Sequence, residues 1–451
     1  MNGKIEHIIE GYKDEMISKL QELIRIESVA SSGGEDCTQE APFGEGPLRA
    51  LQYMMALGKE KGFSCINYDN KVCELGFGEE KEDSVGVACH VDVVPAGGDW
   101  TYPPYGGQLH DGRIYGRGAV DDKGPTIAAF YAALAIKESG LALRKNVTHI
   151  IGSYEESGRF PCICHYLASA KKLPSCGIVP DSYFPVCFSE KHFVNITLVA
   201  RAEGESASGE KPELISIKGG DAINVVPSWA EAVFAGKDGE AAEVVKAAGL
   251  AAHASTPQQG ENAIAGLINR LAKRDFEPAS ICDAVKHLSR LMCRDTSGEG
   301  LGIALEDETG ATTSNMGLIS YEDGLLKVQA NIRLPLSIGR EELLSRISER
   351  IAGTGFEIED IYFLDGFYTD PKKEPAKTLI QVYREATGDM DSKPYANGSG
   401  SYARVMNGFI PFGVALEREP LQFHVEDEAI TVERLMEAAK IYAEALYRLA
   451  V

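Results

Sequence analysis

A chain of 451 residues is longer than the roughly 250–300 residues at which a single hydrophobic core usually stops growing, so we expect two domains. Its hydrophobic share of 44% and charged share of 25% are near those of an average globular protein and do not indicate disorder. The formal net charge of −22 argues against nucleic acid or an anionic membrane as a partner, because both would repel a polyanion.

The expected compartment is the cytoplasm. No stretch reaches the about 20 apolar residues needed to cross a bilayer, and the opening sequence MNGKIEHIIEGYKDEM lacks the apolar core and cleavage site of a signal peptide. The ten cysteines have no framework spacing, so we expect reduced, mostly buried thiols. Cys162, Cys164 and His165 do not have the spacing of a structural zinc site, and packing is the favoured interpretation.

The first part of the chain alternates predicted helices with short apolar runs. Near-helical spacing of apolar residues predicts a helix over residues 8–24, and a second helix follows Pro47 and stops at Gly62. The next predicted elements are a strand at 84–91, a helix at 125–140 and a strand that begins at 146. After residue 375 the alternation of strands and helices resumes, with a predicted strand at 410–416 and a long helix that Thr431 can cap. This pattern is typical of an α/β sheet with crossover helices.

Between residues 192 and 375 the pattern changes, and the predicted strands and helices lie apart from the motifs that contain the candidate metal ligands. The predicted strands are 195–206, 213–221, 325–335 and 356–365, and the predicted helices are 261–274 and 340–353. We interpret this segment as a separate α+β domain inserted into the first. The α/β domain, a mixed sheet with flanking helices, is then discontinuous, and consists of residues 1–191 and 376–451.

Several polar side chains follow predicted strands. His90 and Asp92 end the run SVGVACHVDVVP and share one face, because strand side chains repeat every two residues. At the carboxyl end of a strand that face points into the usual ligand crevice of an α/β sheet, where His90 could bind a metal while Asp92 accepts from its other ring nitrogen. A surface turn with ordinary polar residues is the plainer interpretation.

Four further sites complete a possible ligand set. They are the acidic pair Asp121-Asp122 before a helix, the pair Glu155-Glu156 after a strand, Asp181 after another strand, and His424 in a polar turn. The aspartates could merely cap a helix. Adjacent carboxylates repel unless a cation or proton lies between them, however, and oxygen and nitrogen ligands of these types suit zinc, with manganese or cobalt as substitutes.

The motifs HVDVVPAG, GRGAVDDKGP, EES, PDSYFP, GGDAINVVP, HASTP and the late histidine occur in this order. This set resembles the dinuclear zinc metallopeptidases that include carboxypeptidase G, the aminoacylases and, as the most similar pattern, the PepV-type dipeptidases. The resemblance implies a discontinuous zinc-peptidase catalytic domain with an inserted α+β lid at residues 192–375. The length of that insertion favours a doubled lid unit.

The resemblance also implies a role for each candidate residue of the first domain. His90 would bind one zinc and His424 the other, Asp122 would bridge both ions, and Glu156 and Asp181 would complete the two sites. Glu155 would be the general base that takes a proton from the bridging water, and Asp92 would orient His90.

In the inserted domain the resemblance implies contacts with the substrate. His253 would stabilise the tetrahedral oxyanion, and Asn224 would add a second polar contact. Arg333, on the polar face of its predicted strand, would clamp the substrate carboxylate beside the glycine-rich loop that contains Ser399 and Gly400. A turn residue for His253 and an exposed arginine paired with an acid for Arg333 are the plainer interpretations.

The sequence therefore predicts a metallodipeptidase that uses two zinc ions to cleave dipeptides with a free C-terminal carboxylate. An N-acyl-amino-acid deacylase with the same machinery, and an inactive homologue that only binds metal or ligand, are the alternatives. The sequence departs from the pattern of the resembled family at Tyr154, at SEKH (189–192) and at NGSGSYAR. These departures lie near the expected substrate-binding region and put the substrate preference in question. A doubled lid would supply His253 within one chain, so a monomer is favoured, with a dimer as the other option.

Overall fold

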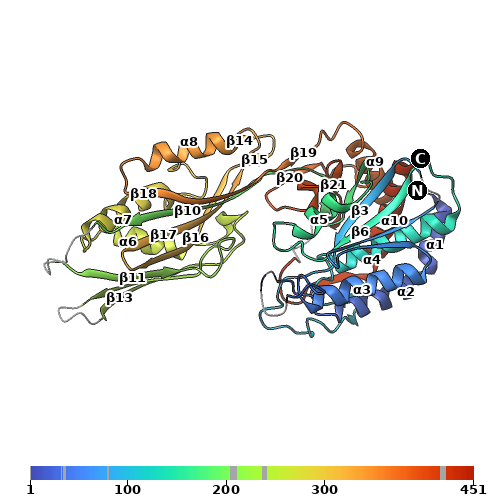
Figure 1. Ribbon diagram of the computed structural model, residues 1–451, viewed down its shortest axis with the longest axis horizontal. Helices are drawn as coiled ribbons and strands as arrows, with labels where there is room; N and C mark the ends of the chain where they lie inside the picture. Colours follow the sequence, from blue (N-terminus) through green and yellow to red (C-terminus); the bar gives the residue numbers. More distant parts are fainter. Residues whose placement is uncertain are drawn as a thin grey trace. The chain divides into compact units, whose positions relative to one another are not determined.

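The computed structural model describes residues 2–31, 33, 37–78, 81–203, 211–235, 241–416 and 423–451. Its contacts divide the chain into two compact units, coloured along the sequence in Figure 1. The first unit consists of Met1–Phe188, Tyr368–Tyr395 and Gly400–Val451, and the second of Ser189–Phe367 and Ala396–Ser399. Within the described part of the chain, no helix has the length and apolar character that a bilayer crossing requires.

The predicted opening helix consists of two helices, α1 (Gly3–Gly11) and α2 (Lys13–Ile24). The break lies at Tyr12, whose backbone N–H donates to Ile9 O and ends the first helix. The side chain of Asn2 caps α1 by accepting from the Lys4 backbone N–H. The predicted second helix is α3 (Glu45–Glu60), with Pro47 in its first turn.

A six-stranded mixed sheet forms the centre of the first unit. Its order is β1 (Ser64–Tyr68), β2 (Val72–Phe77), β6 (Asn146–Gly152), β3 (Ser84–His90), β7 (Cys176–Val179) and β21 (Phe409–Pro411). The last four strands of this order run parallel to one another. β2 runs antiparallel to both of its neighbours, β1 and β6. The predicted α/β sheet is therefore confirmed. Because neighbouring strands run parallel, the carboxyl ends of β3, β6 and β7 meet at one edge.

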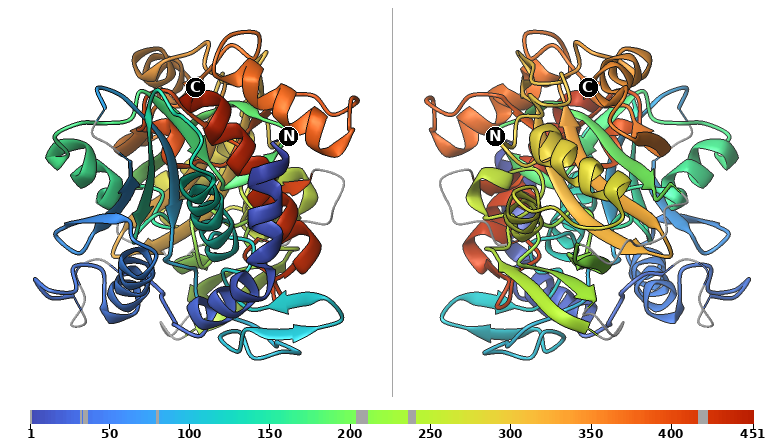
Figure 2. Two further views of the ribbon diagram at one scale, coloured as in Figure 1. Left: turned by 90° about the vertical axis from the view of Figure 1, so that its right-hand side faces the viewer. Right: turned by 90° about the vertical axis from the view of Figure 1, so that its left-hand side faces the viewer.

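Helices cover both faces of this sheet. On one face, α4 (Lys123–Ser139) and α10 (Val432–Ala450) contact each other and the central strands, and α1 packs on both (Figure 2). The helix α9 (Ala376–Thr387) contacts α10. Alternation in β2 shows which helix lies on the opposite face. Leu75 belongs to the core that contains α3 and α4, whereas Glu74 points the other way and accepts from Tyr166 of α5 (Pro161–Ser169).

Smaller strand pairs extend the first unit. Strands β4 (Gln108–His110), β5 (Arg113–Tyr115) and β23 (Ala429–Thr431) form a three-stranded sheet, in which Ala429 pairs with Tyr115. Strands β8 (Ser182–Phe184) and β22 (Val414–Leu416) pair in parallel. Where the chain passes between the units it forms β9 (Cys187–Glu190), β19 (Phe367–Tyr368) and β20 (Tyr395–Asn397).

The second unit contains one continuous seven-stranded antiparallel sheet. The strand order is β13 (Ala241–Ala248), β12 (Trp229–Ala235), β11 (Glu213–Gly219), β16 (Thr313–Glu322), β17 (Leu325–Leu334), β10 (His192–Arg201) and β18 (Phe356–Leu364). Helices α6 (Ala263–Leu271), α7 (Ala279–Met292) and α8 (Arg340–Ile351) pack on this sheet. The short hairpin β14 (Glu306–Asp307) and β15 (Gly310–Ala311) completes the strands of the described part. The predicted strand at 195–206 ends at Arg201, and residues 204–206 lie outside the described residues.

The predicted alternation in β17 is confirmed. Val328, Ala330 and Ile332 belong to the buried core of the second unit, and Asn331 and Arg333 face the other way. Both polar side chains are nevertheless buried. The polar face of β17 is thus covered, which the sequence pattern alone did not predict.

Candidate metal centre

The candidate ligands gather where the parallel strands of the first unit end. β3 ends at His90, Glu155 and Glu156 follow β6 after a short turn, and Asp181 follows β7. Because these strands are neighbours in the sheet and run in the same direction, their carboxyl ends bring the side chains together. The turn before α4 adds Asp121 to the same place.

His90 lies at the centre of the cluster and is buried. Its Nε2 is 3.0 Å from Asp121 Oδ1 and 4.0 Å from Asp181 Oδ2. Its Nδ1 is 3.0 Å from the backbone carbonyl oxygen of Asp92, which can only accept. The proton of the neutral ring therefore resides on Nδ1, and the Nε2 lone pair faces the acids.

His424 approaches the same acids from the C-terminal part of the chain. Its Nε2 is 3.1 Å from Asp121 Oδ2 and 3.2 Å from Glu156 Oε2. The two carboxylate oxygens of Asp121 thus face two different imidazoles. This is the arrangement expected of a residue that is shared between two metal ions.

The prediction put Asp122 in that position, and the side chain that lies there is Asp121. Asp122 turns the other way, and its Oδ2 accepts from the backbone N–H of His90 at 3.0 Å. Consecutive side chains point in different directions, so only one of two adjacent acids can face the histidines. The sequence shows that acids are present at this position, but the backbone path determines which of the two faces the histidines.

Asp92 supports more than the prediction assigned to it. Its Oδ1 lies 3.4 Å from His90 Nδ1, and its Oδ2 accepts from the backbone N–H groups of Glu155 at 2.9 Å and Glu156 at 3.0 Å. One buried side chain therefore orients the histidine and holds the turn that carries both glutamates.

The acids of this cluster strongly influence one another. Burial and the nearby charge of Asp181 raise the pKa of the Glu155 carboxyl well above its ordinary value. Burial disfavours a charged His424, but the charge of Glu156 and a hydrogen bond with Asp121 outweigh burial and raise the pKa of His424 to about 11. Concentrated negative charge thus stabilises positive charge at this position.

These residues fit bound divalent cations. Two groups of side chains place one ligand atom each within 4.8 Å of one another, namely His90, Asp121 and Glu156, and His90, Glu155 and Asp181. Glu155 Oε1 is buried and has no hydrogen-bond partner within the described residues. Carboxylate oxygens and imidazole nitrogens are ligands that zinc, manganese and cobalt accept.

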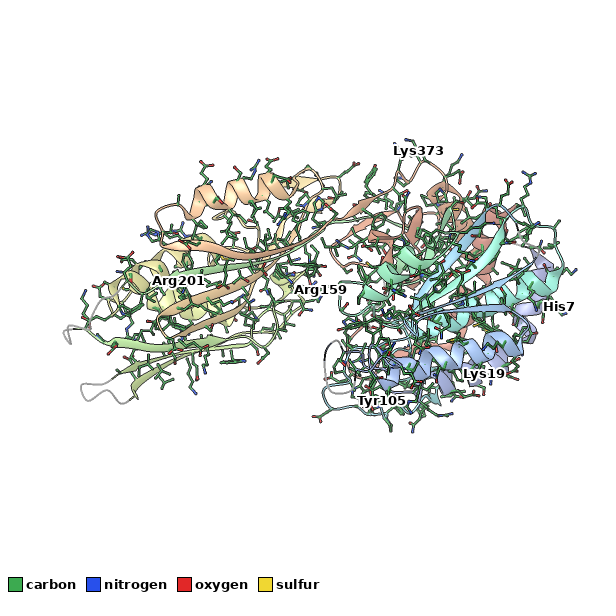
Figure 3. The ribbon with its side chains drawn as sticks, viewed as in Figure 1. His7, Lys19, Tyr105, Arg159, Arg201 and Lys373 are labelled. Atoms are coloured by element: carbon green, nitrogen blue, oxygen red, sulfur yellow. The ribbon has the colours of Figure 1, made fainter. Side chains whose placement is uncertain are left out.

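Two other histidines illustrate positions outside the cluster. His7 lies on α1, where Figure 3 labels it, and is exposed. His149 is buried in β6, and neither of its ring nitrogens has a hydrogen-bond partner in the described structure. Burial lowers the pKa of His149 to about 3, so this ring is neutral.

In the second unit, His253 occupies a turn beside Asn224. Backbone pairing joins the two segments, since Ala254 N–H donates to Asn224 O at 3.0 Å and Val225 forms a bridge with His253. Nδ1 of His253 accepts from the backbone N–H of Ser255 at 3.2 Å and lies 2.6 Å from the Ser255 hydroxyl oxygen. Both His253 and Asn224 are exposed.

Arg333 is only 3% exposed, so the interpretation as an exposed arginine is wrong. Its guanidinium lies over the Phe193 ring at 4.2 Å, and Nε donates to Asn331 Oδ1 at 3.0 Å. Nη1 donates to the carbonyl oxygen of Gly398 at 2.7 Å, which ties the arginine to the glycine-rich loop. Ser399 follows in the same unit, and Gly400 begins the next segment of the first unit.

Reasoning from the sequence missed three buried residues near the ligands. Arg117 and Glu428 form an ion pair at 2.8 Å between the segments that carry Asp121 and His424. Tyr402 lies edge-on to His90, with ring centroids 6.4 Å apart, and its hydroxyl is 3.0 Å from Cys162 Sγ. The position of Arg117 inside the motif GRGAVDDKGP, close to the two aspartates, was the available signal for this residue.

Two comparisons relate the sequence of this chain to known proteins. Residues 86–448 match the family described as peptidase family M20/M25/M40. A putative dipeptidase of Staphylococcus epidermidis is 33% identical over 472 residues, which cover 99% of each chain.

Two solved structures share the fold. The dipeptidase Dug1p from Saccharomyces cerevisiae has a TM-score of 0.61 at 14% identity, covering 99% of this chain and 98% of that one. A Bacillus subtilis protein described as a dinuclear metal binding peptidase has a TM-score of 0.54 at 11% identity, covering 98% and 99%.

Proposed function

The chain belongs to peptidase family M20/M25/M40, and from this membership we propose that it hydrolyses the peptide bond of dipeptides with a free C-terminal carboxylate at a two-zinc centre. The observation that supports this proposal best is the position of Asp121, whose two carboxylate oxygens lie 3.0 Å from His90 Nε2 and 3.1 Å from His424 Nε2. Such a carboxylate can serve two ions at once.

Two sets of ligands follow from these contacts. We assign His90, Asp121 and Asp181 to one ion, and Asp121, Glu156 and His424 to the other. A bound pair of divalent ions supplies a water molecule of lowered pKa and polarises the scissile carbonyl. Zinc is the proposed metal, and manganese and cobalt accept the same ligands.

Glu155 is the proposed general base. Its carboxyl group is buried in the cluster, its Oε1 has no hydrogen-bond partner within the described residues, and its pKa is raised by burial and by Asp181. A carboxyl group with a raised pKa can take a proton from water and pass it to the leaving amine near neutral pH. Asp92 holds Glu155 in place through the backbone N–H.

Substrate recognition is proposed for the second unit, which would act as the lid, while the first unit would be the catalytic domain. Arg333 presents a rigid fork of N–H donors that suits a carboxylate, and the loop with Ser399 and Gly400 adds backbone amides. His253 would donate to the oxyanion, with Asn224 as a further polar contact.

We also propose that the chain works as a monomer in the cytoplasm, with a dimer as the alternative. The ten cysteines all lie among the described residues and form no disulfide there, which suits a reducing compartment.

The substrate class can be tested with the full chain, depleted of metal and reloaded with Zn²⁺, Mn²⁺ or Co²⁺. We expect dipeptides to be cleaved faster than N-acetyl- and N-succinyl-amino acids, and dipeptide amides to react at least about tenfold more slowly because Arg333 loses its charged partner. Faster turnover of the acylated substrates would make the protein a deacylase. No turnover of either class by protein with two bound ions would make it a binding protein.

The Glu155→Gln variant tests the base separately. We expect it to bind both ions and to lose turnover by about 10²–10⁴-fold or more, because the amide cannot accept a proton. The matched control is Glu74→Gln, which changes a half-buried carboxylate held by Tyr68 and Tyr166 on the opposite face of the sheet. Equal losses in both variants would argue against Glu155 as the base.

A further inference from the structure

A buried ion pair lies beside the cluster without contributing a ligand. Arg117 is 2% exposed and Glu428 is 0% exposed, and Arg117 Nη1 donates to Glu428 Oε2 at 2.8 Å. Burying two opposite charges costs so much desolvation that apolar side chains often stabilise a fold equally well. A pair of this kind therefore calls for a reason beyond stability.

The fold brings these distant residues together through a strand pair. β5 and β23 are antiparallel, with Tyr115 opposite Ala429, and the pairing continues as Gly116 N–H donates to Glu428 O at 2.9 Å. Arg117 and Glu428 thus extend from the ends of two paired strands. The next residues along these two segments, in opposite chain directions, lead to Asp121 and to His424.

Glu428 holds the segment that carries Asp121. Its Oε1 accepts from the backbone N–H of Val120 at 2.8 Å and from that of Asp121 itself at 3.2 Å. The carboxylate thus satisfies two backbone donors in the turn before α4. It sets the position of the Asp121 backbone, from which the shared carboxylate projects.

Arg117 holds the segment that carries His424. Its Nη1 also donates to the carbonyl oxygen of Val425 at 3.0 Å, next to a histidine whose φ of 60° lies in the left-handed region that non-glycine residues rarely adopt. Its Nη2 donates to Ala96 O at 3.0 Å and lies 3.4 Å from Pro95 O, in the loop after His90 and Asp92. The Trp100 ring covers the guanidinium at 5.1 Å.

We propose that Arg117 and Glu428 are a positioning pair that sets the separation between Asp121 and His424. This separation in turn determines the affinity for the metal ion assigned to Asp121, Glu156 and His424. This inference rests on the proposed two-metal function. One guanidinium fork and one carboxylate join the three segments that carry His90, Asp121 and His424. A change in either partner alters the distance between ligands without removing any of them.

Metal titration of the full chain tests the pair. Metal-depleted protein is titrated with Zn²⁺ against a competing chelator, and with Co²⁺ by visible absorption. His424→Ala identifies which of two binding steps belongs to the ion at His424. We expect Glu428→Gln and Arg117→Lys to weaken that same step by about 10–100-fold, the loss typical when a residue that supports a ligand is changed. Both variants should alter the Co²⁺ spectrum, and excess metal should restore turnover.

The matched control is Glu444→Gln. Glu444 is also a buried carboxylate that accepts from an arginine, Arg448, at 2.7 Å and from a backbone N–H, that of Asn2, at 2.8 Å, but it lies on α10 away from the ligands. We expect both binding steps to stay within about twofold of the wild type in this variant. Equal weakening in the control would show a general effect of lost stability.

Variants that break a buried pair can fail to fold, because one charge is left without its partner. The double variant Arg117→Met with Glu428→Met removes both charges together and carries the test in that case. It should fold and still lose affinity at the His424 step. Unchanged affinity at this step in any folded variant would overturn the inference. Absence of two binding steps in the wild type would instead overturn the proposed function.

Discussion

At the scale of single residues, the proposed two-metal site depends on which of two adjacent aspartates is shared between the ions. Asp121 faces both histidines, and Asp122 accepts from a backbone N–H. We expect Asp121→Asn to weaken metal binding by more than about 100-fold, beyond the loss typical of changing a residue that only supports a ligand. Asp122→Asn keeps an oxygen that can accept from the His90 N–H and should retain two ions. Metal content after dialysis measures both, and a larger loss in Asp122→Asn would contradict the assignment.

The tautomer of His253 is a second prediction at this scale. The Ser255 backbone N–H can only donate, so Nδ1 of His253 must accept and the proton of the neutral ring must lie on Nε2. ¹⁵N NMR of histidine-labelled protein should show the Nε2–H form. Ser255→Ala should keep it, because the backbone donor remains. A protonated Nδ1 at neutral pH would contradict this reading of the turn.

The sequence predicted which residue types gather, but not every orientation. His90, Asp181, Glu156 and His424 follow strands or a turn whose ends the α/β pattern places at one edge, and the structure brings them together. Asp121 could not be told from Asp122, because the direction of each side chain depends on backbone angles that residue types do not determine. Arg117 and Glu428 were missed because their contact depends on pairing between strands 311 residues apart.

At the scale of elements, a buried histidine in the central strand β6 should make the free energy of unfolding depend on pH. His149 is buried and neutral in the folded protein, with its pKa lowered to about 3, whereas the unfolded chain takes up a proton below about pH 6.5. The unfolded state therefore binds more protons as the pH falls from about 6.5 to 3. The free energy of unfolding should decrease by about 1 kcal/mol per pH unit through this window.

Urea unfolding of metal-depleted protein at pH 7.5 and 5.5 measures this decrease. The variant His149→Leu should remove about 1 kcal/mol of the pH dependence. His7→Leu, at an exposed position on α1, is the matched control for replacing a histidine with leucine. An equal pH dependence in wild type and His149→Leu would show that β6 is not its source.

Elements with strong periodicity were predicted well, and their ends were predicted less well. The alternation in β17 was correct because one face of that strand lies on a core and each residue switches face. The opening helix was predicted as one piece although it breaks at Tyr12. Ile9, Met16 and Leu20 are buried in one core on either side of the break, so apolar spacing continues across it and conceals it.

At the scale of the whole molecule, metal removal should affect the two units differently. All proposed ligands belong to the first unit, where several acids would repel one another without cations. A ligand that binds only the folded state stabilises it by about 4 kcal/mol at a concentration 1,000 times its Kd. Chelation should therefore increase hydrogen exchange in peptides that cover 84–92, 117–125, 152–157 and 423–430. Peptides from β11, β12 and α7 should not change, and an equal increase in both units would contradict the assignment.

The pairing of β23 with β5 has a consequence for the order in which the protein is made. A ribosome adds His90, Asp121, Glu156 and Asp181 first, then the whole second unit, and only afterwards His424 and Glu428. The nascent chain therefore cannot assemble the complete centre until the inserted unit has been translated. On the proposed assignment of ligands, synthesis from one end to the other thus keeps the site incomplete in a chain that still lacks the part proposed to select its substrate.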